Sequence, residues 1–326
     1  MKLIAKIMDM DSADMMAFLH SYDAGTLGGR ENDRIRIETS RGDAVMVLSI
    51  SDTYAKKGEI YVIDEVMTKL KIADGDEVDV YFSANPESVR SIRKKMDKEK
   101  LSREEIYGIV EDIADSKLCK IEVSAWLTAL YINGMDIEEV AAFTQAMVDT
   151  GDRVQFERTP VFDFHSMGGV PGNKVTPIVV SIVASAGMMI PKTSSRAISS
   201  ACGTSDFVET FCSVELDAQT LKRISEEVGG VLAWGGSMNL APVDDMVIRI
   251  EHPLGINPRA QMLASIMSKK VAIGATHLVV DIPTGAGTKV PTIEVARAYA
   301  RDFMDLGEAL NIHVECAITY ADQPVG

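Results

Sequence analysis

Four segments of the chain combine glycine, hydroxyl and cationic side chains in patterns suited to anion binding. The first, residues 163–174, reads DFHSMGGVPGNK, and its glycines lead from a strand pattern into a helix pattern. Such a turn lets backbone N–H groups approach an anion at the positive end of the helix dipole, and Ser166, Lys174 and Thr176 add donors. It is neither a Walker A loop nor GxGxxG, so it predicts neither ATP nor NAD. A purely structural turn is the alternative.

The second segment, residues 192–206, reads KTSSRAISSACGTSD and gathers small hydroxyl side chains around one arginine. Hydroxyl groups donate to phosphate oxygens without steric bulk, and a guanidinium can bind two oxygens at once. The segment therefore predicts a phosphate-binding loop. The alternative is a serine-rich turn in which Arg196 pairs with Asp206.

The third segment, residues 253–270, predicts a helix that can hold a heterocycle. Asn257 suits the N-cap of this helix and Pro258 its first turn. Ser265 and Lys269 stand four residues apart, so they share a face and can bind the edge of a base. A capped helix with a solvated lysine pair is the alternative.

The fourth segment, residues 281–289, reads DIPTGAGTK and again places a glycine loop after a strand pattern. It suits a second anion or a sugar hydroxyl, or else a plain strand-to-helix connection. From residue 161 onward, strand and helix patterns alternate up to a last strand at 313–320, which predicts a mainly parallel sheet covered on both faces. Ligands of such sheets bind at the carboxyl ends of the strands, where the glycine loops fall.

Two further regions precede this α/β part, so the chain is predicted to be a multidomain α/β protein. Residues 1–84 are β-rich, with strands expected at 34–39, 44–50 and 59–63 and a short helix at 64–70. They predict a small barrel of double-psi type or another small β-module. Residues 85–158 are helical, completed by part of 240–275, with apolar faces that suit a partner subunit. The α/β domain then takes residues 159–326.

Helix ends in the middle region carry recognisable signals. Ser102 with Glu105, and Asp136 with Glu139, form the capping-box pattern at two helix starts. Gly134 is expected to end one helix in the left-handed conformation. Gly151 is expected to end another in the same way.

Composition excludes several classes of function. The 326 residues are 46% hydrophobic, enough for two or three domains, and the formal net charge is -15. That charge repels nucleic acid and anionic membranes, so neither is expected as a partner, and any phosphate site must be a local pocket of donors. The four cysteines show no CxxC or metal-ligand spacing, so we expect reduced thiols in a cytoplasm and no metal.

Taken in order, the four segments resemble those of the thymidine and pyrimidine-nucleoside phosphorylase family. Ser194 to Glu209 follows the family signature, except that Cys202 stands where relatives have Gly or Ala. The GGVPGNK loop, the SSRAIS stretch and the β-rich first region resemble an archaeal, nucleotide-cleaving branch of that family. The resemblance covers essentially the whole chain. Relatives continue beyond Gly326, so the chain is expected to be a fragment or a shortened member.

The resemblance implies phosphorolysis: phosphate attacks C1′ of a ribose while the base leaves with a proton. The implied substrate is AMP, or CMP or UMP, and the products are a free base and ribose 1,5-bisphosphate. Inorganic phosphate is the co-substrate, no cofactor is implied, and a homodimer or higher homo-oligomer is expected. The resemblance places phosphate at Ser166, Thr176, Ser194 and Thr204. Nucleotide-binding positions are Gly169, Ser195, Arg196, Ala197, Ile198, Ser199, Ser200, Thr204, Ser265, Lys269 and Lys289, with Arg196 for the 5′-phosphate.

Two residues depart from the family pattern. Asn257 stands where the nucleotide-cleaving branch has an aspartate that donates a proton, and an amide can donate only a hydrogen bond. Phe164 stands where pyrimidine-specific relatives have a lysine before the His165–Ser166 pair. His165 or water is then the remaining candidate acid. Pyrimidine-nucleoside phosphorolysis and a catalytically impaired nucleotide-binding protein stay open as alternatives.

Overall fold

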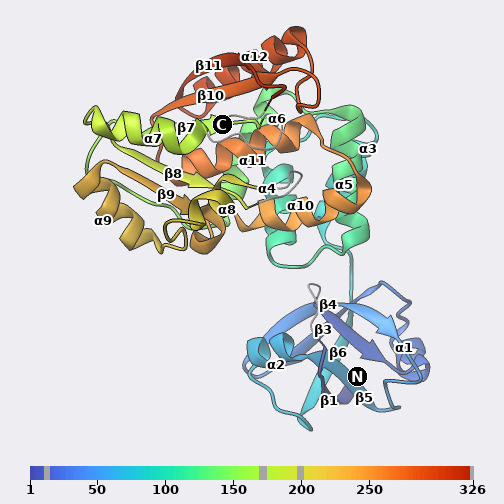
Figure 1. Ribbon diagram of the computed structural model, residues 1–326. Coiled ribbons are helices and arrows are strands. Elements are labelled where there is room, and N and C mark those ends of the chain that lie inside the picture. Colours follow the sequence, from blue (N-terminus) through green and yellow to red (C-terminus); the bar gives the residue numbers. More distant parts are fainter. Residues whose placement is uncertain (11–14, 169–174, 197–201, 324–326) are drawn as a thin grey trace. The chain divides into compact units, whose positions relative to one another are not determined.

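The computed structural model describes residues 1–10, 15–168, 175–196 and 202–323. The chain divides into two compact units (Figure 1). One unit comprises residues 1–93 and 111–126, and the other comprises residues 94–110 and those from 127 onward. Each unit has its own core, so each is described separately.

The first unit is built around a closed β-barrel. Its strands hydrogen-bond in the order β1-β5-β2-β4-β3-β6, with parallel pairs β1–β5 and β2–β4 and antiparallel pairs elsewhere. Ile35, Ile37, Ile60 and Val80 are fully buried, because alternate side chains of a strand point into the barrel. The predicted β-rich region is thus confirmed. The elements are β1 Lys2–Met8, β2 Met16–Leu19, α1 Ser21–Leu27, β3 Arg34–Thr39, β4 Gly42–Ile50, β5 Glu59–Ile63, α2 Asp64–Leu70 and β6 Glu77–Ser83.

A run of helices follows the barrel strands in the chain, as the sequence predicts. They are α3 Glu87–Met96, α4 Arg103–Ala114, α5 Lys120–Asn133 and α6 Ile137–Asp149. Both capping boxes are present: Ser102 Oγ accepts from the Glu105 N–H at 3.3 Å, and Asp136 Oδ1 accepts from the Glu139 N–H at 2.9 Å. Gly134 ends α5 with a positive φ of 66°, also as predicted.

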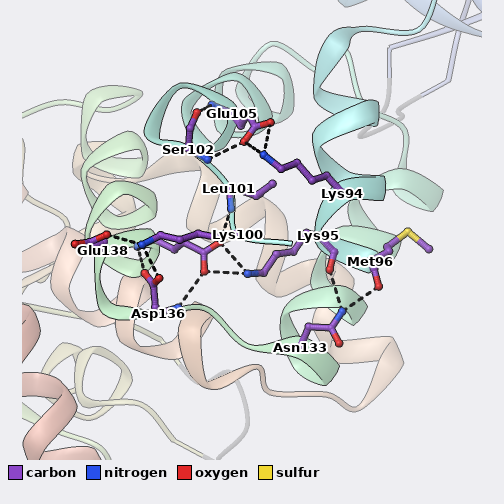
Figure 2. Close-up of polar contacts among 11 residues, drawn as sticks. Lys94, Lys95, Met96, Lys100, Leu101, Ser102, Glu105, Asn133, Asp136 and Glu138 are labelled. Atoms are coloured by element: carbon purple, nitrogen blue, oxygen red, sulfur yellow. Dashed lines mark hydrogen bonds and ion pairs between the residues drawn. The ribbon is translucent and has the colours of Figure 1, made fainter. Parts of the chain in front are cut away.

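Within the second unit, a buried ion pair joins Lys95, in the last turn of α3, to Glu139 of α6 (Figure 2). Lys95 Nζ lies 2.8 and 2.9 Å from the two carboxylate oxygens of Glu139, and the two side chains are 5% and 3% exposed. The same carboxylate accepts the backbone N–H groups of Leu101 and Asp136. Both oxygens of Glu139 are therefore engaged, and Lys94, next in the chain, pairs with the half-exposed Glu105.

The rest of the second unit is an α/β arrangement with parallel strands, as predicted. One sheet has the order β11-β10-β7 and another pairs β8 with β9. In Figure 1, α12 lies along β10 and β11, and α7 packs on β7, β8 and β9. The elements are β7 Phe162–Ser166, α7 Val175–Ser185, β8 Ile190–Ser194, α8 Thr204–Glu209, α9 Ala218–Val228, β9 Gly230–Trp234, α10 Pro242–Leu254, α11 Arg259–Ala272, β10 His277–Thr284, α12 Ile293–Ala309 and β11 His313–Tyr320.

Helices α10 and α11 both pack against α6. Asn257 does not cap α11, contrary to the prediction. The N-cap is Pro258, which has φ -61° and ψ 128°, and no side chain caps the helix. Because Pro258 is itself extended rather than helical, it takes the N-cap position and the helix starts one residue later than predicted, at Arg259.

Gly151 does not end α6 in a left-handed conformation either. The C-cap of α6 is Thr150, and Gly151 is not among the glycines with positive φ. Instead, a Cβ at Gly151 would lie 2.6 Å from the Asn239 carbonyl oxygen and 2.8 Å from Pro242 Cδ. The glycine serves close approach, because α6 ends directly against the chain that leads into α10.

Candidate active site

A cavity of about 900 Å³ lies in the second unit, between the ends of strands β7 and β8 and the helices α10 and α11. The structure brings together in its lining nearly all of the described residues that the sequence singled out. They are His165, Ser166, Thr176, Ser194, Ser195, Arg196, Thr204, Asn257, Ser265, Lys269 and Lys289. Gly169, Ala197, Ile198, Ser199 and Ser200 lie outside the described residues. The roles given to these residues stay predictions.

Hydroxyl groups at the strand ends are held by buried partners. Ser166 Oγ donates to Asp281 Oδ2 at 2.7 Å, and Thr319 Oγ1 donates to the other oxygen of Asp281 at 2.5 Å. Asp281 belongs to β10, which pairs with β7 in parallel so that Asp281 lies opposite Ser166. In the neighbouring sheet, Ser194 Oγ lies 2.8 Å from Ser205 Oγ. The register of parallel strands thus presets these donors.

Two buried lysines, Lys192 and Lys270, line the cavity. Lys270 is 2% exposed and lies 2.8 Å from Asp163, whose side chain is fully buried. Lys192 is 4% exposed, and among the described residues its ammonium donates to the Thr193 carbonyl and pairs with no carboxylate. Burial, and then the charge of Lys270, lower the pKa of Lys192 to about 7. Lys192 is therefore a cation of the cavity that lacks a direct counterion in the described part of the chain.

The same surroundings favour the neutral form of His165. Burial, followed by the charges of Lys270 and Lys192, holds the pKa of His165 well below its usual range. A neutral imidazole can donate or accept a hydrogen bond, but it has no imidazolium proton to give at neutral pH. His165 is thus poorly suited to the role of acid that the sequence left open for it.

A carboxylate that the sequence patterns did not reveal organises the base-suited face of α11. Asp244 in α10 is fully buried and accepts hydrogen bonds from Ser265 Oγ at 2.9 Å and Gln261 Nε2 at 3.1 Å. It also pairs with the ammonium of Lys269. Ser265 and Lys269 do share a face, as their spacing predicts. The only signal for Asp244 in the sequence is an acidic residue in the first turn after Pro242.

A second carboxyl group of α10 has no such partner. Glu251 is 8% exposed and lines the cavity, yet its buried Oε1 makes no hydrogen bond within the described part of the chain. Burial, followed by the negative charge of Asp244, raises the pKa of Glu251 to about 8. Asn257, three residues beyond the end of α10, lines the same cavity. Local sequence patterns do not distinguish such an unpaired carboxyl from a solvated one.

Arg196 is already engaged by carboxylates. Its guanidinium lies 2.5 and 2.9 Å from the oxygens of Glu209, 3.1 Å from Glu215 and 3.5 Å from Asp206. It also lies over the ring of Trp234, 4.7 Å from the ring centroid. The pairing with Asp206 that the sequence offered as an alternative is present. An anion that binds Arg196 must therefore displace or share one of these carboxylates.

Two domain families match consecutive stretches of the chain. The helical bundle domain of the glycosyl transferase family matches residues 89–151, and the a/b domain of that family matches residues 158–324. The chain belongs to the glycosyl transferase family. The helical region followed by an α/β region is thus a family feature, and the residues that line the cavity all fall within the range that matches the a/b domain.

Relatives of this glycosyl transferase family member include archaeal AMP phosphorylases. The chain is 47% identical to AMP phosphorylase 1 of Archaeoglobus fulgidus over 315 residues, covering 97% of this chain and 62% of the relative. It is 48% identical to AMP phosphorylase of Thermococcus kodakarensis over 326 residues, covering 100% of this chain and 65% of the relative. The chain thus spans less than two thirds of the length of these relatives.

Among solved structures, the glycosyl transferase fold is shared with anthranilate phosphoribosyltransferase from Thermus thermophilus. The TM-score is 0.57 at 19% identity, covering 70% of this chain and 65% of the other. This likeness concerns the fold alone. Within the described part of the chain, no helix is both long and apolar enough to cross a membrane.

Proposed function

We propose that this chain carries the catalytic site of an AMP phosphorylase. Phosphate attacks C1′ of the ribose, the bond from C1′ to N9 of adenine breaks, and ribose 1,5-bisphosphate forms. The observation that carries the proposal is a single cavity that joins a cationic, hydroxyl-rich end to a Ser265–Lys269 face suited to a base. Identities of 47% and 48% to AMP phosphorylases over nearly the whole chain support it.

The attacking phosphate is assigned to the end of the cavity formed by β7 and β8. Thr176, Ser194 and Thr204 supply hydroxyl donors there, and Ser166 does so when its proton turns from Asp281 to the phosphate. Phe164 is buried and carries no charge, so the cation that pyrimidine-specific relatives place at this point must come from elsewhere. Lys192 is suited to replace it, because a dianion beside a buried ammonium favours its charged form.

The base is assigned to α11. Asp244 holds the Lys269 ammonium and the Ser265 hydroxyl in fixed positions, so both can meet the edge of a purine without further ordering. The 5′-phosphate of AMP is assigned to Arg196, which exchanges one of its carboxylate partners on binding. Gly169, Ser195 to Ser200, Thr204 and Lys289 complete the assigned nucleotide contacts.

We further propose a homodimer or higher homo-oligomer formed through the helical region, acting in the cytoplasm. The reaction needs inorganic phosphate and no organic cofactor. The domain scheme of residues 1–84, 85–158 with part of 240–275, and 159–326 stays a prediction.

One observation favours a second candidate, a nucleotide-binding protein with impaired catalysis. Asn257 lines the cavity but cannot give up a proton, and His165 is neutral. This candidate predicts that AMP binds while adenine is not released.

Phosphorolysis by the full-length protein separates the two. AMP is incubated with and without phosphate, and adenine and ribose 1,5-bisphosphate are followed by chromatography, with thymidine and uridine as comparison substrates. Phosphate-dependent adenine release at roughly one turnover per second supports AMP phosphorylase. Binding of AMP without release supports the impaired protein, and turnover of nucleosides but not AMP supports a pyrimidine-nucleoside phosphorylase.

A further inference from the structure

Departure of adenine from C1′ requires a proton, because the neutral base is a far better leaving group than its anion. This requirement rests on the proposed function. Asn257 cannot supply the proton, and burial and the neighbouring lysines disfavour the charged form of His165. Lys269 and Lys270 are each tied to a buried aspartate, and transfer of their protons would leave that aspartate uncompensated. Lys192 and Lys289 are assigned to the phosphate and to the nucleotide under the proposed function. The carboxyl groups of the cavity lining are the other candidates for the acid.

Three aspartates lie buried behind the cavity lining, and each is engaged by its neighbours. Asp163 faces Lys270, Asp281 accepts from two hydroxyls, and Asp244 accepts from Ser265, Gln261 and Lys269. Both oxygens of each aspartate therefore already accept hydrogen bonds within the fold, and none of the three carboxyl groups is in the cavity lining.

Two described carboxyl groups line the cavity, Asp245 and Glu251, and Glu251 is the buried one. It is nine-tenths buried, its Oε1 has no hydrogen-bond partner within the described residues, and no described cation pairs with it. An unpaired carboxylate buried in this way is costly, and protonation removes the cost. Burial also raises the pKa of Asp245, although Lys269 opposes the shift. Asp245 is nevertheless exposed as a residue, and neither of its oxygens is a buried atom without a hydrogen-bond partner.

The position of Glu251 suits a donor to the base. Seven residues separate it from Asp244, which is about two helical turns, so both side chains lie on the same side of α10. Asp244 holds the base-suited Ser265 and Lys269. Glu251 thus enters the cavity on the side of the base, and Asn257 follows shortly after in the chain.

We propose that Glu251 is the acid that protonates the leaving base. Its carboxyl proton passes to a ring nitrogen of adenine as the C1′–N9 bond breaks and the bond from a phosphate oxygen to C1′ forms. Glu251 is left as a carboxylate and regains a proton from solvent after the products leave. In this scheme Asn257 donates a hydrogen bond from its amide and does not act as the acid.

The surroundings of Glu251 set the pH range of this step. Burial raises its pKa to about 8, so it holds its proton at neutral pH and lies close to the optimum for a general acid. Turnover should fall above about pH 8, where the carboxyl ionises.

The test compares Glu251→Gln with wild type in the full-length protein at saturating phosphate. Loss of a general acid should lower kcat for AMP by about 10²–10⁴-fold, with KM for AMP changed less than about threefold. Glu308→Gln, at an exposed position in α12, controls for the same chemical change and should match wild type.

A second substrate isolates the proton transfer. With 4-nitrophenyl β-D-ribofuranoside 5-phosphate, the nitrophenolate leaves without protonation, so Glu251→Gln should lose less than about tenfold. Glu251→Asp should regain part of the activity on AMP, and Glu251→Gln should lack the decline in turnover above about pH 8.

The outcomes separate failure of this assignment from failure of the proposed function. If wild type releases adenine and Glu251→Gln matches it, or if the variant loses both substrates equally, Glu251 is not the acid. If wild type itself releases no adenine from AMP, the proposed function fails, and the assignment of Glu251 fails with it.

Discussion

Adjacent lysines of α11 should separate stability from catalysis. Lys270 is 2% exposed against a fully buried Asp163, whereas Lys269 is 26% exposed. Changing Lys270 to Met leaves Asp163 with one described donor, the Phe164 N–H at 2.7 Å. Loss of one partner from a buried pair costs about 3–5 kcal/mol. That loss is a large share of the stability of an ordinary domain.

The matched change Lys269→Met should cost less. Asp244 keeps two donors, Ser265 Oγ and Gln261 Nε2, and cavity water can occupy the position of the lost ammonium. We expect a loss of about 1–2 kcal/mol in the free energy of unfolding. Lys269→Met should nevertheless raise KM for AMP strongly, because it removes a group assigned to the base under the proposed function.

Urea unfolding of each variant, together with kinetics on AMP, measures both effects. The double variant Asp163→Asn, Lys270→Met removes both charges and should recover most of the stability lost by Lys270→Met alone. Equal destabilisation by the two lysine variants, or no recovery in the double variant, would refute this division of roles.

Three further changes test other parts of the structure. Lys192→Met should raise KM for phosphate about tenfold, equivalent to about 1.4 kcal/mol, with KM for AMP little changed. In wild type, steady-state kinetics should show KM for phosphate rising with pH through about 7, as the Lys192 ammonium loses its proton. Lys95→Met should lower the free energy of unfolding, measured with urea, by about 3–5 kcal/mol because it leaves Glu139 buried without its cation. Lys94→Met, at the more exposed pair with Glu105, should lower it by at most about 1 kcal/mol. Equal effects would contradict the argument from burial. Folding raises the pKa of Glu251 from 4.5 to about 8, so its contribution to stability is present below pH 4.5 and is lost as pH rises through 8. In Glu251→Gln, the melting temperature should therefore fall less steeply with pH over this range than in wild type.

Local patterns predicted much of the fold. The alternation in residues 34–39 gave the bounds of β3, and the bounds of β5, α2 and β11 also agree with the expected ranges. These elements have clear periodicity and are bounded by turn-forming residues. Helix α10 was not predicted as an element, because Pro242 and Pro253 interrupt its pattern. Pro242 lies in the first turn, where proline is tolerated, whereas Pro253 lies inside the helix near its end, which local patterns do not predict.

The candidate site was predicted only in part. Its glycine loops and the Ser265–Lys269 face depend on spacing along the chain, and spacing can be read directly. The importance of Asp244, Lys192 and Glu251 depends on burial and on which partner each side chain meets across the fold. Those contacts join residues that no periodicity connects, so a single sequence does not reveal them.

The close approach at Gly151 places an evolutionary constraint far along the chain from the cavity residues. Any side chain there would push against the Asn239 carbonyl and Pro242, at the entry to α10. The same helix carries Asp244 and Glu251, so a shift of its first turn would be transmitted to both. A substitution at position 151 should therefore reduce turnover as well as stability. A homologue without this glycine would need compensating changes in residues 239–242.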